Sequence, residues 1–165
     1  VAIVAAAAGL VWWTVGGGTP SGTTVFEVRD QQTGAVLYSR EIAVGETFRL
    51  EHTHSVTRRP VVETFSVHDP GTLAIEELWF DEFGANLPAG PERIGDRVTT
   101  FLHEDGAYRV IHDGHPIGTL PILVGSEAVD HVVSFDDGDR LRLLDLTRAG
   151  GHVELAVNEG HNQGE

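Results

Sequence analysis

Hydrophobic and polar residues alternate with a period of two along most of the chain after residue 22. This alternation is typical of β-strands that bury one face and expose the other. Turn residues separate the alternating runs, as at Thr33-Gly34, Asp69-Pro70-Gly71, Asp105-Gly106 and Asp113-Gly114. The runs that predict strands are 24–29, 35–39, 47–54, 61–68, 73–80, 97–103, 108–112, 117–124, 132–135, 141–146 and 152–157.

The strand pattern predicts an all-β fold. About ten short strands at this spacing indicate an antiparallel β-sandwich or a barrel. No amphipathic helix pattern follows Ser21, and the chain has no internal repeat and no interior linker. We therefore expect one β domain over residues 23–157, with residues 158–165 as a disordered tail.

Residues 1–22 have a different character. Residues 1–15 are uncharged and nearly all apolar, and a glycine-rich spacer follows to residue 22. The apolar run is shorter than the ~20 residues of a spanning helix and is closer to the hydrophobic region of a signal peptide. The Trp12-Trp13 pair before the spacer favours the interfacial end of a membrane anchor. We expect an N-terminal hydrophobic helix acting as signal or anchor, with the β domain outside the cytoplasm; the alternative is a buried helix.

The composition narrows the range of partners. The formal net charge is -14, from 25 Asp and Glu against 11 Lys and Arg, and all 11 are Arg. This balance argues against nucleic acid or an anionic membrane surface as a partner. It suits a halophilic protein, because salt screens the self-repulsion, although an ordinary acidic protein is the alternative. The chain has no Cys, which excludes disulfides, thiolate metal sites and cysteine nucleophiles.

Four polar residues fall on positions that strand alternation assigns to the core. Such residues need a partner, because an inward charge is costly when it is unpaired. They are His52 and His54 in the run 47–54, Glu63 in the run 61–68, and Glu77 in the run 73–80.

The expected hairpin between the first two of these runs brings the polar residues together. Its register places His54 opposite Glu63 or one diagonal step away, with Glu77 on the same face of the third strand. A histidine and two carboxylates then converge at one end of the core. Such a cluster is a satisfied structural pair, a pocket for a small molecule or a cation, or a catalytic site.

Metal binding and nucleophilic catalysis receive less support. His52, His54 and Glu63 are ligand types for a divalent metal, but two imidazoles at this spacing on a strand are a weak signal. Ser55 follows His54 directly, and adjacent strand residues face opposite ways, so the two form a poor nucleophile–base pair. His112-Asp113-Gly114-His115 is interpreted as a turn, and Asp136-Asp137-Gly138-Asp139 as a solvated hairpin tip rather than a calcium loop.

Four short blocks carry a family resemblance. They are Thr53-His54-Ser55-Val56, Pro60-Val61-Val62-Glu63-Thr64-Phe65, Glu77, and Gly84-Ala85-Asn86-Leu87-Pro88. Together they resemble the conserved blocks of the domain-of-unknown-function family numbered 1850, from about Gly45 to Pro88. Asn86 stands where that family usually has glycine. Asn tolerates the left-handed conformation better than most residues, so we expect the turn to survive.

The resemblance implies a small exported protein encoded beside a TRAP transporter of the TAXI type, and no established activity. We therefore expect a membrane-tethered, extracytoplasmic accessory domain that binds solute or a membrane or solute-binding subunit of the transporter. Its expected ligand-binding residues are His54, Glu63, Glu77, Ser55, Gly84, Asn86 and Pro88. The alternatives are a metal-dependent hydrolase using His52, His54, Glu63 and Glu77, and a purely structural surface module.

Overall fold

The computed structural model of the protein describes residues 24–160, which form thirteen β-strands and one 3-10 helix. The expected N-terminal helix and residues 161–165 of the expected tail lie outside this range. Within it, no helix has the length and apolar character needed to cross a membrane. The elements are β1 (Thr24–Asp30), β2 (Val36–Ile42), β3 (Thr47–Thr53), β4 (Pro60–Asp69), β5 (Thr72–Phe80), β6 (Arg93–Ile94), β7 (Arg97–Val98), β8 (Thr100–Glu104), β9 (Ala107–Gly118), β10 (Leu120–Leu123), β11 (Val132–Phe135), β12 (Arg140–Arg142), η1 (Leu143–Asp145) and β13 (His152–Glu159).

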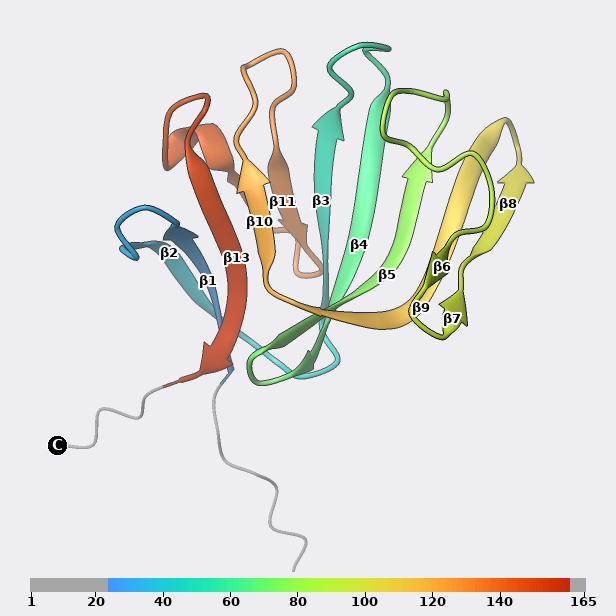
Figure 1. Ribbon diagram of the computed structural model, residues 1–165. Helices are drawn as coiled ribbons and strands as arrows, with labels where there is room; N and C mark the ends of the chain where they lie inside the picture. The colour runs from blue at the N-terminus through green and yellow to red at the C-terminus, as the bar shows by residue number, and fades with distance from the viewer. Residues whose placement is uncertain (1–23, 161–165) are drawn as a thin grey trace, which may run out of the picture.

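The strands form two main antiparallel sheets (Figure 1). One has four strands in the order β10-β13-β1-β2, and the other has seven in the order β12-β11-β3-β4-β5-β9-β8. A separate two-stranded ribbon joins β6 and β7. The all-β prediction is confirmed. Of the two expected architectures the sandwich-like one is observed, because both sheets stay open at their edges and no barrel closes.

Four sequence-based expectations are corrected by the structure. The run 97–103 divides into β7 and β8, and the run 141–146 contains only the end of β12 before η1 begins. The Asp113-Gly114 pair is not a hairpin turn. Asp113 (φ 54°) and Gly114 (φ 66°) instead form a β-bulge inside β9, which pairs with β5 on both sides of it. The last strand continues to Glu159, two residues beyond its predicted end at 157.

The main core lies between the two sheets. Phe26 of β1 meets Phe48 of β3 and Phe135 of β11 edge-to-face, with ring centroids 5.1 and 5.2 Å apart. Phe65 of β4 stacks on Phe48 at 5.4 Å. All four rings are at most 2% exposed, and burying each stabilises the fold by roughly 1.5–3 kcal/mol. These contacts hold the four-stranded sheet over one end of the larger sheet.

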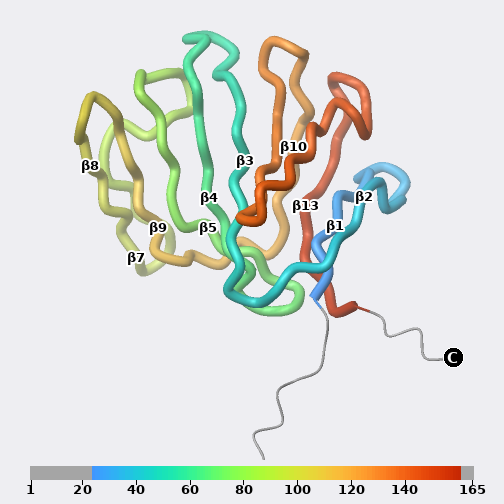
Figure 2. Tube along the Cα trace, turned by 180° about the vertical axis from the view of Figure 1, so that it is seen from behind, coloured from blue at the N-terminus to red at the C-terminus, as the bar shows by residue number. Residues whose placement is uncertain are grey.

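The rest of the larger sheet is covered by the chain between β5 and β8. Val61, Leu78, Phe80 and Val110 form a second apolar cluster on this part of the sheet. Leu87, from the loop 81–92, packs against it. Both views of the molecule show this loop at the same end as the loop 54–59 and the loop 124–131 (Figures 1 and 2). Three loops therefore gather at one end of the larger sheet.

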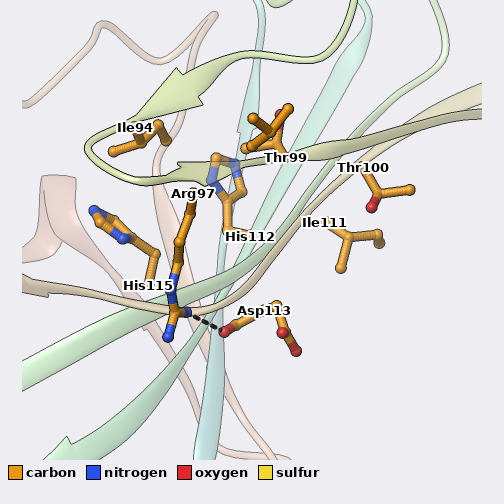
Figure 3. A pocket seen from close by; sticks show the side chains of 9 residues that line it. Ile94, Arg97, Thr99, Thr100, Ile111, His112, Asp113 and His115 are labelled. Atoms are coloured by element: carbon orange, nitrogen blue, oxygen red, sulfur yellow. Dashed lines mark hydrogen bonds between the residues drawn. The ribbon is translucent and has the colours of Figure 1, made fainter.

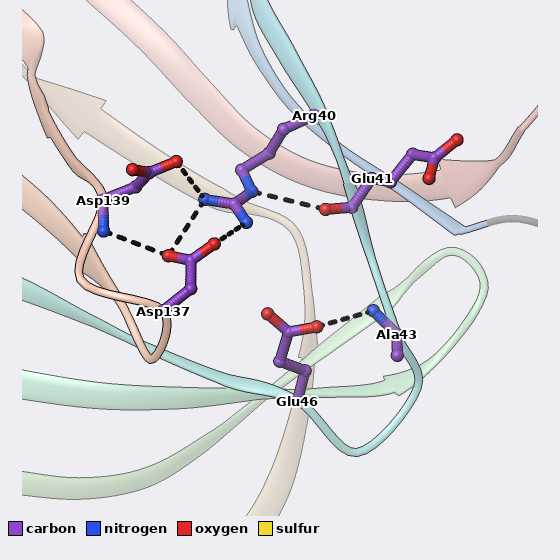
Figure 4. Close-up of polar contacts among 6 residues, drawn as sticks. All are labelled: Arg40, Glu41, Ala43, Glu46, Asp137 and Asp139. Atoms are coloured by element: carbon purple, nitrogen blue, oxygen red, sulfur yellow. Dashed lines mark hydrogen bonds and ion pairs between the residues drawn. The ribbon is translucent and has the colours of Figure 1, made fainter.

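Arg40 of β2 links the two sheets (Figure 4). Its guanidinium donates hydrogen bonds to the carboxylates of Asp137 and Asp139, in the turn between β11 and β12. The guanidinium carbon also lies 4.2 Å from the ring centroid of Phe135, a cation–π contact. The side chain is only 17% exposed. Arg40 therefore combines ion pairing with packing on the edge of the main core.

Replacing Arg40 with glutamine is expected to lower the free energy of unfolding by about 1 kcal/mol. Part of this loss should persist at high salt, because the contact with Phe135 is shielded from solvent whereas exposed ion pairs are screened. Urea unfolding at low and high salt measures it. The matched control is Arg140→Gln, which removes a 56% exposed arginine paired with Glu51. If the two substitutions lower the free energy of unfolding equally at both salt concentrations, the contact between Arg40 and Phe135 does not contribute to stability.

Candidate functional site

A pocket of about 350 Å³ opens where the three loops meet. Its walls come from the ends of β3, β4 and β5 and from the loops 54–59, 81–92 and 124–131 (Figures 1 and 2). Apolar side chains from the second cluster, Val61, Leu78 and Leu87, form part of the lining. The polar residues that line it are His52, His54, Ser55, Glu63, Asn86 and His131.

His54 holds two of the loops together. Its Nε2 lies 2.9 Å from the carbonyl oxygen of Ala85, and its Nδ1 lies 3.2 Å from the amide nitrogens of Val56 and Thr57. A carbonyl only accepts and an amide only donates, so the ring is neutral with its proton on Nε2. Both nitrogens are thereby satisfied, and the side chain is buried. His54 thus lines the pocket with its ring but has no free nitrogen for a ligand.

Gly84 and Asn86 shape the loop that His54 holds. A Cβ on Gly84 would lie 2.6 Å from both Cε1 and Nε2 of His54, so the ring occupies the space that glycine leaves. Leu87 donates its amide to the Gly84 carbonyl at 3.2 Å, closing a turn in which Asn86 has φ 68°. The expected left-handed Asn86 is therefore observed. Pro88 follows this turn and, like Gly84, is not part of the pocket lining.

Glu63 occupies the middle of an apolar row. Across five neighbouring strands the residues run Val133, Leu50, Glu63, Leu78 and Val110. The carboxyl is thus flanked by two buried leucines, and burial raises its pKa. Within residues 24–160 no group donates a hydrogen bond to it or forms an ion pair with it. Glu63 is therefore an inward acid without a protein partner, facing an open pocket.

The expected pairing of His54 with Glu63 is wrong. The register sets Glu63 opposite Leu50, and the hairpin pairing stops at Thr53 opposite Pro60. His54 therefore lies beyond the end of the ladder, where its ring turns to the loop 81–92 instead. The two residues share a pocket but form no hydrogen bond or ion pair with each other.

Glu77 is not part of the site, contrary to expectation. A β-bulge leaves Glu76 without a partner on β4 or β9 and reverses the alternation of β5. Leu78 and Phe80 consequently face the core, and Glu77 faces away from it. There it accepts hydrogen bonds from both Nε and Nη2 of Arg109, the former at 2.9 Å. The carboxylate is a partner in a surface ion pair.

His131 is a pocket residue that the sequence reasoning missed. Its ring centroid lies 5.0 Å from that of His52. The amide of Gly125 donates to Nδ1 of His131 at 3.2 Å, which leaves its proton on Nε2. Val132 pairs with Glu51, so His131 follows one step beyond, beside His52. Only the order of strands in the sheet brings these two histidines together.

Two histidines of the pocket, His52 and His131, are neutral near pH 7. Burial, together with the neighbouring His131 and His54, lowers the pKa of His52 to about 4. Burial also lowers the pKa of His131. The Nδ1 atom of His52 is buried and has no hydrogen-bond partner within residues 24–160. The pocket therefore offers uncharged imidazoles rather than positive charge beside Glu63.

The arrangement does not form a metal centre. Among residues 24–160 no group of three or more His, Asp or Glu side chains is placed to hold a metal ion. The predicted metal ligands His52, His54 and Glu63 all line one pocket, but both nitrogens of His54 already have backbone partners. Ser55 lies on the exposed edge of the same pocket.

The fold and the pocket define a β-sandwich-like domain with a polar pocket at its loop end. Residues 48–141 match the family described as Domain of unknown function (DUF1850), and the chain belongs to this family. No curated protein and no solved structure matches the chain. The matched residues include every polar residue of the pocket. Family membership assigns no activity, so a functional proposal has to rest on the chemistry of that pocket.

Proposed function

We propose that the domain is a non-enzymatic binding module whose pocket takes a small solute with a positively charged amino group. The observation that carries this proposal is the unpartnered carboxyl of Glu63 between Leu50 and Leu78. The Glu63 side chain is half-buried, and withdrawing a carboxylate from water without giving it a partner is unfavourable. A bound ammonium group would supply the missing charge and hydrogen bonds.

The surroundings of Glu63 favour a ligand as the source of that charge. The lowered pKa values of His52 and His131 keep both rings uncharged near neutral pH. The Nε2–H of His131, which has no partner within residues 24–160, is a donor that can orient the rest of a solute. The volume of about 350 Å³ is within the range of small-molecule sites.

We further propose that this module works outside the cytoplasm, tethered through residues 1–15, as an accessory to a TRAP transporter of the TAXI type. The uncharged apolar segment with its Trp12-Trp13 pair supports the tether, and the resemblance carried by the four sequence blocks is the ground for proposing the transporter. Purification of the full chain in mild detergent tests this part. Transporter subunits should co-purify with it, and their absence from the purified sample would contradict the association.

The pocket proposal is tested by titrating the protein with propylammonium and following the imidazole resonances of His52 and His131 by NMR. We expect saturable shifts with propylammonium, and none with the neutral analogue propanol. Glu63→Gln should weaken the binding at least tenfold, about 1.4 kcal/mol, because the carboxylate is lost.

Glu77→Gln is the matched control, since it removes an outward carboxylate one strand away. It should leave propylammonium binding unchanged. Binding that survives Glu63→Gln, or shifts that do not saturate, would refute the assignment of the pocket. Circular dichroism of each variant checks that the fold is intact.

A further inference from the structure

A second pocket, of about 450 Å³, lies between β9 and the β6–β7 ribbon, separate from the loop-end site (Figure 3). Its polar lining includes Arg97 of β7, Thr100 of β8, and His112 and His115 of β9. No residue of this pocket belongs to the site around Glu63. Its chemistry is also different, because a permanent positive charge lies in it.

The bulge in β9 places both histidines in this pocket. Residues three apart on a regular strand face opposite sides. Asp113 and Gly114 each have positive φ and reset the alternation, so that His112 and His115 line the same space. A side chain at position 114 would be strained by its φ of 66° and would approach the carboxylate of Glu76 to 3.5 Å. The bulge at residues 113 and 114 therefore determines which side chains of β9 line the pocket.

The donors in the pocket are only partly used. Nη1 of Arg97 donates to the backbone oxygen of Asp113 at 3.0 Å, which fixes the arginine in place. The Nε–Nη2 edge of the same guanidinium has no partner within residues 24–160. In Figure 3 the Asp113 carboxylate points away from the two imidazoles. Nδ1 of His112 is buried and also unpartnered in the same part of the chain.

We propose that this pocket is a second binding site, for a small monoanionic carboxylate that Arg97 holds together with His112 and His115. The free edge of a guanidinium matches the two oxygens of a carboxylate. A monoanion fits better than a dianion because the lining contains a single arginine, Arg97, together with the carboxylate of Asp113, in a protein of net charge -14. Burial lowers the pKa of His112, so this ring acts as a neutral hydrogen-bonding group near pH 7.

The test is an NMR titration of the full-length chain with sodium acetate, with sodium chloride and phosphate as comparison anions. The imidazole resonances of His112 and His115 should shift saturably with acetate, and should respond less to phosphate. Arg97→Gln should weaken acetate binding at least tenfold. Arg93→Gln is the matched control, because Arg93 lies on the neighbouring strand β6 and does not line the pocket.

Several results of the acetate titration would overturn the proposal. Acetate binding that is equal in Arg97→Gln and the native protein would overturn the proposal, as would identical shifts with chloride, or phosphate binding tighter than acetate. If Arg97→Gln fails to fold, Arg97→Lys keeps the charge and loses the planar fork. It should then bind acetate more weakly than the native protein, and unchanged binding would overturn the role of the guanidinium edge.

Discussion

Replacing Gly84 with alanine is expected to lower the free energy of unfolding by about 2–3 kcal/mol. The new Cβ would lie 2.6 Å from Cε1 and Nε2 of His54. The ring cannot retreat without losing its hydrogen bonds to Ala85, Val56 and Thr57, and the loop cannot retreat without breaking the same bond to Ala85. Urea unfolding followed by circular dichroism measures the loss.

Gly90→Ala is the control for this prediction. It lies in the same loop, has no atom within 4 Å of its would-be Cβ, and does not have a left-handed φ. Its effect should stay within about 0.5 kcal/mol. In a His54→Ala background the penalty of Gly84→Ala should disappear, because the clash is then absent. If Gly84→Ala lowers the free energy of unfolding equally in the His54→Ala protein, the loss does not come from the contact with His54.

The contact between His54 and Gly84 also explains why two separate sequence blocks are paired. Thr53-His54-Ser55-Val56 and Gly84-Ala85-Asn86-Leu87-Pro88 lie on different loops, and one side chain joins them through Ala85. The sequence alone indicated that this histidine falls on an inward position. Its partner was not predictable, because the ring points along the sheet to a loop rather than across to the adjacent strand.

Strand alternation predicted the all-β fold and the inward position of Glu63, because the pleat of a strand is a local property. It failed at Glu77 and at Asp113-Gly114, where a bulge inserts a residue and reverses or resets the alternation. A bulge is set by pairing with neighbouring strands, and a turn-forming pair such as Asp-Gly suits a hairpin equally well.

The other errors arise from long-range pairing. The register of β3 and β4 follows from packing across the whole sheet, and it sets Leu50 opposite Glu63. His131 enters the pocket because β11 pairs with β3, although the two strands are far apart in the sequence. Local patterns carry no information on which distant strands become neighbours, so the sequence could not predict that His131 lies beside His52.

Replacing Glu63 with leucine is expected to raise the free energy of unfolding at pH 7 by about 1–3 kcal/mol while abolishing propylammonium binding. The substitution completes the apolar row between Leu50 and Leu78 and removes a half-buried acid that has no partner within residues 24–160. Urea unfolding at several pH values measures the gain.

The gain should depend on pH with a defined sign. The folded state raises the pKa of Glu63 above its ordinary 4.5, so stability from this group is present below pH 4.5 and is lost as the pH rises through the folded pKa. The advantage of Glu63→Leu should therefore shrink toward pH 4 and grow toward neutrality. His52, whose pKa is lowered from 6.5 to about 4, gives the opposite trend, since stability falls as the pH drops below 6.5. That contribution is common to both proteins and cancels to first order in their difference.

Glu77→Leu, which removes an outward ion-paired acid, should give no such gain. A Glu63→Leu protein less stable than the native one at pH 7, or a gain equal at pH 4 and pH 7, would show that the Glu63 carboxylate is not the unsatisfied charge on which the pocket proposal depends.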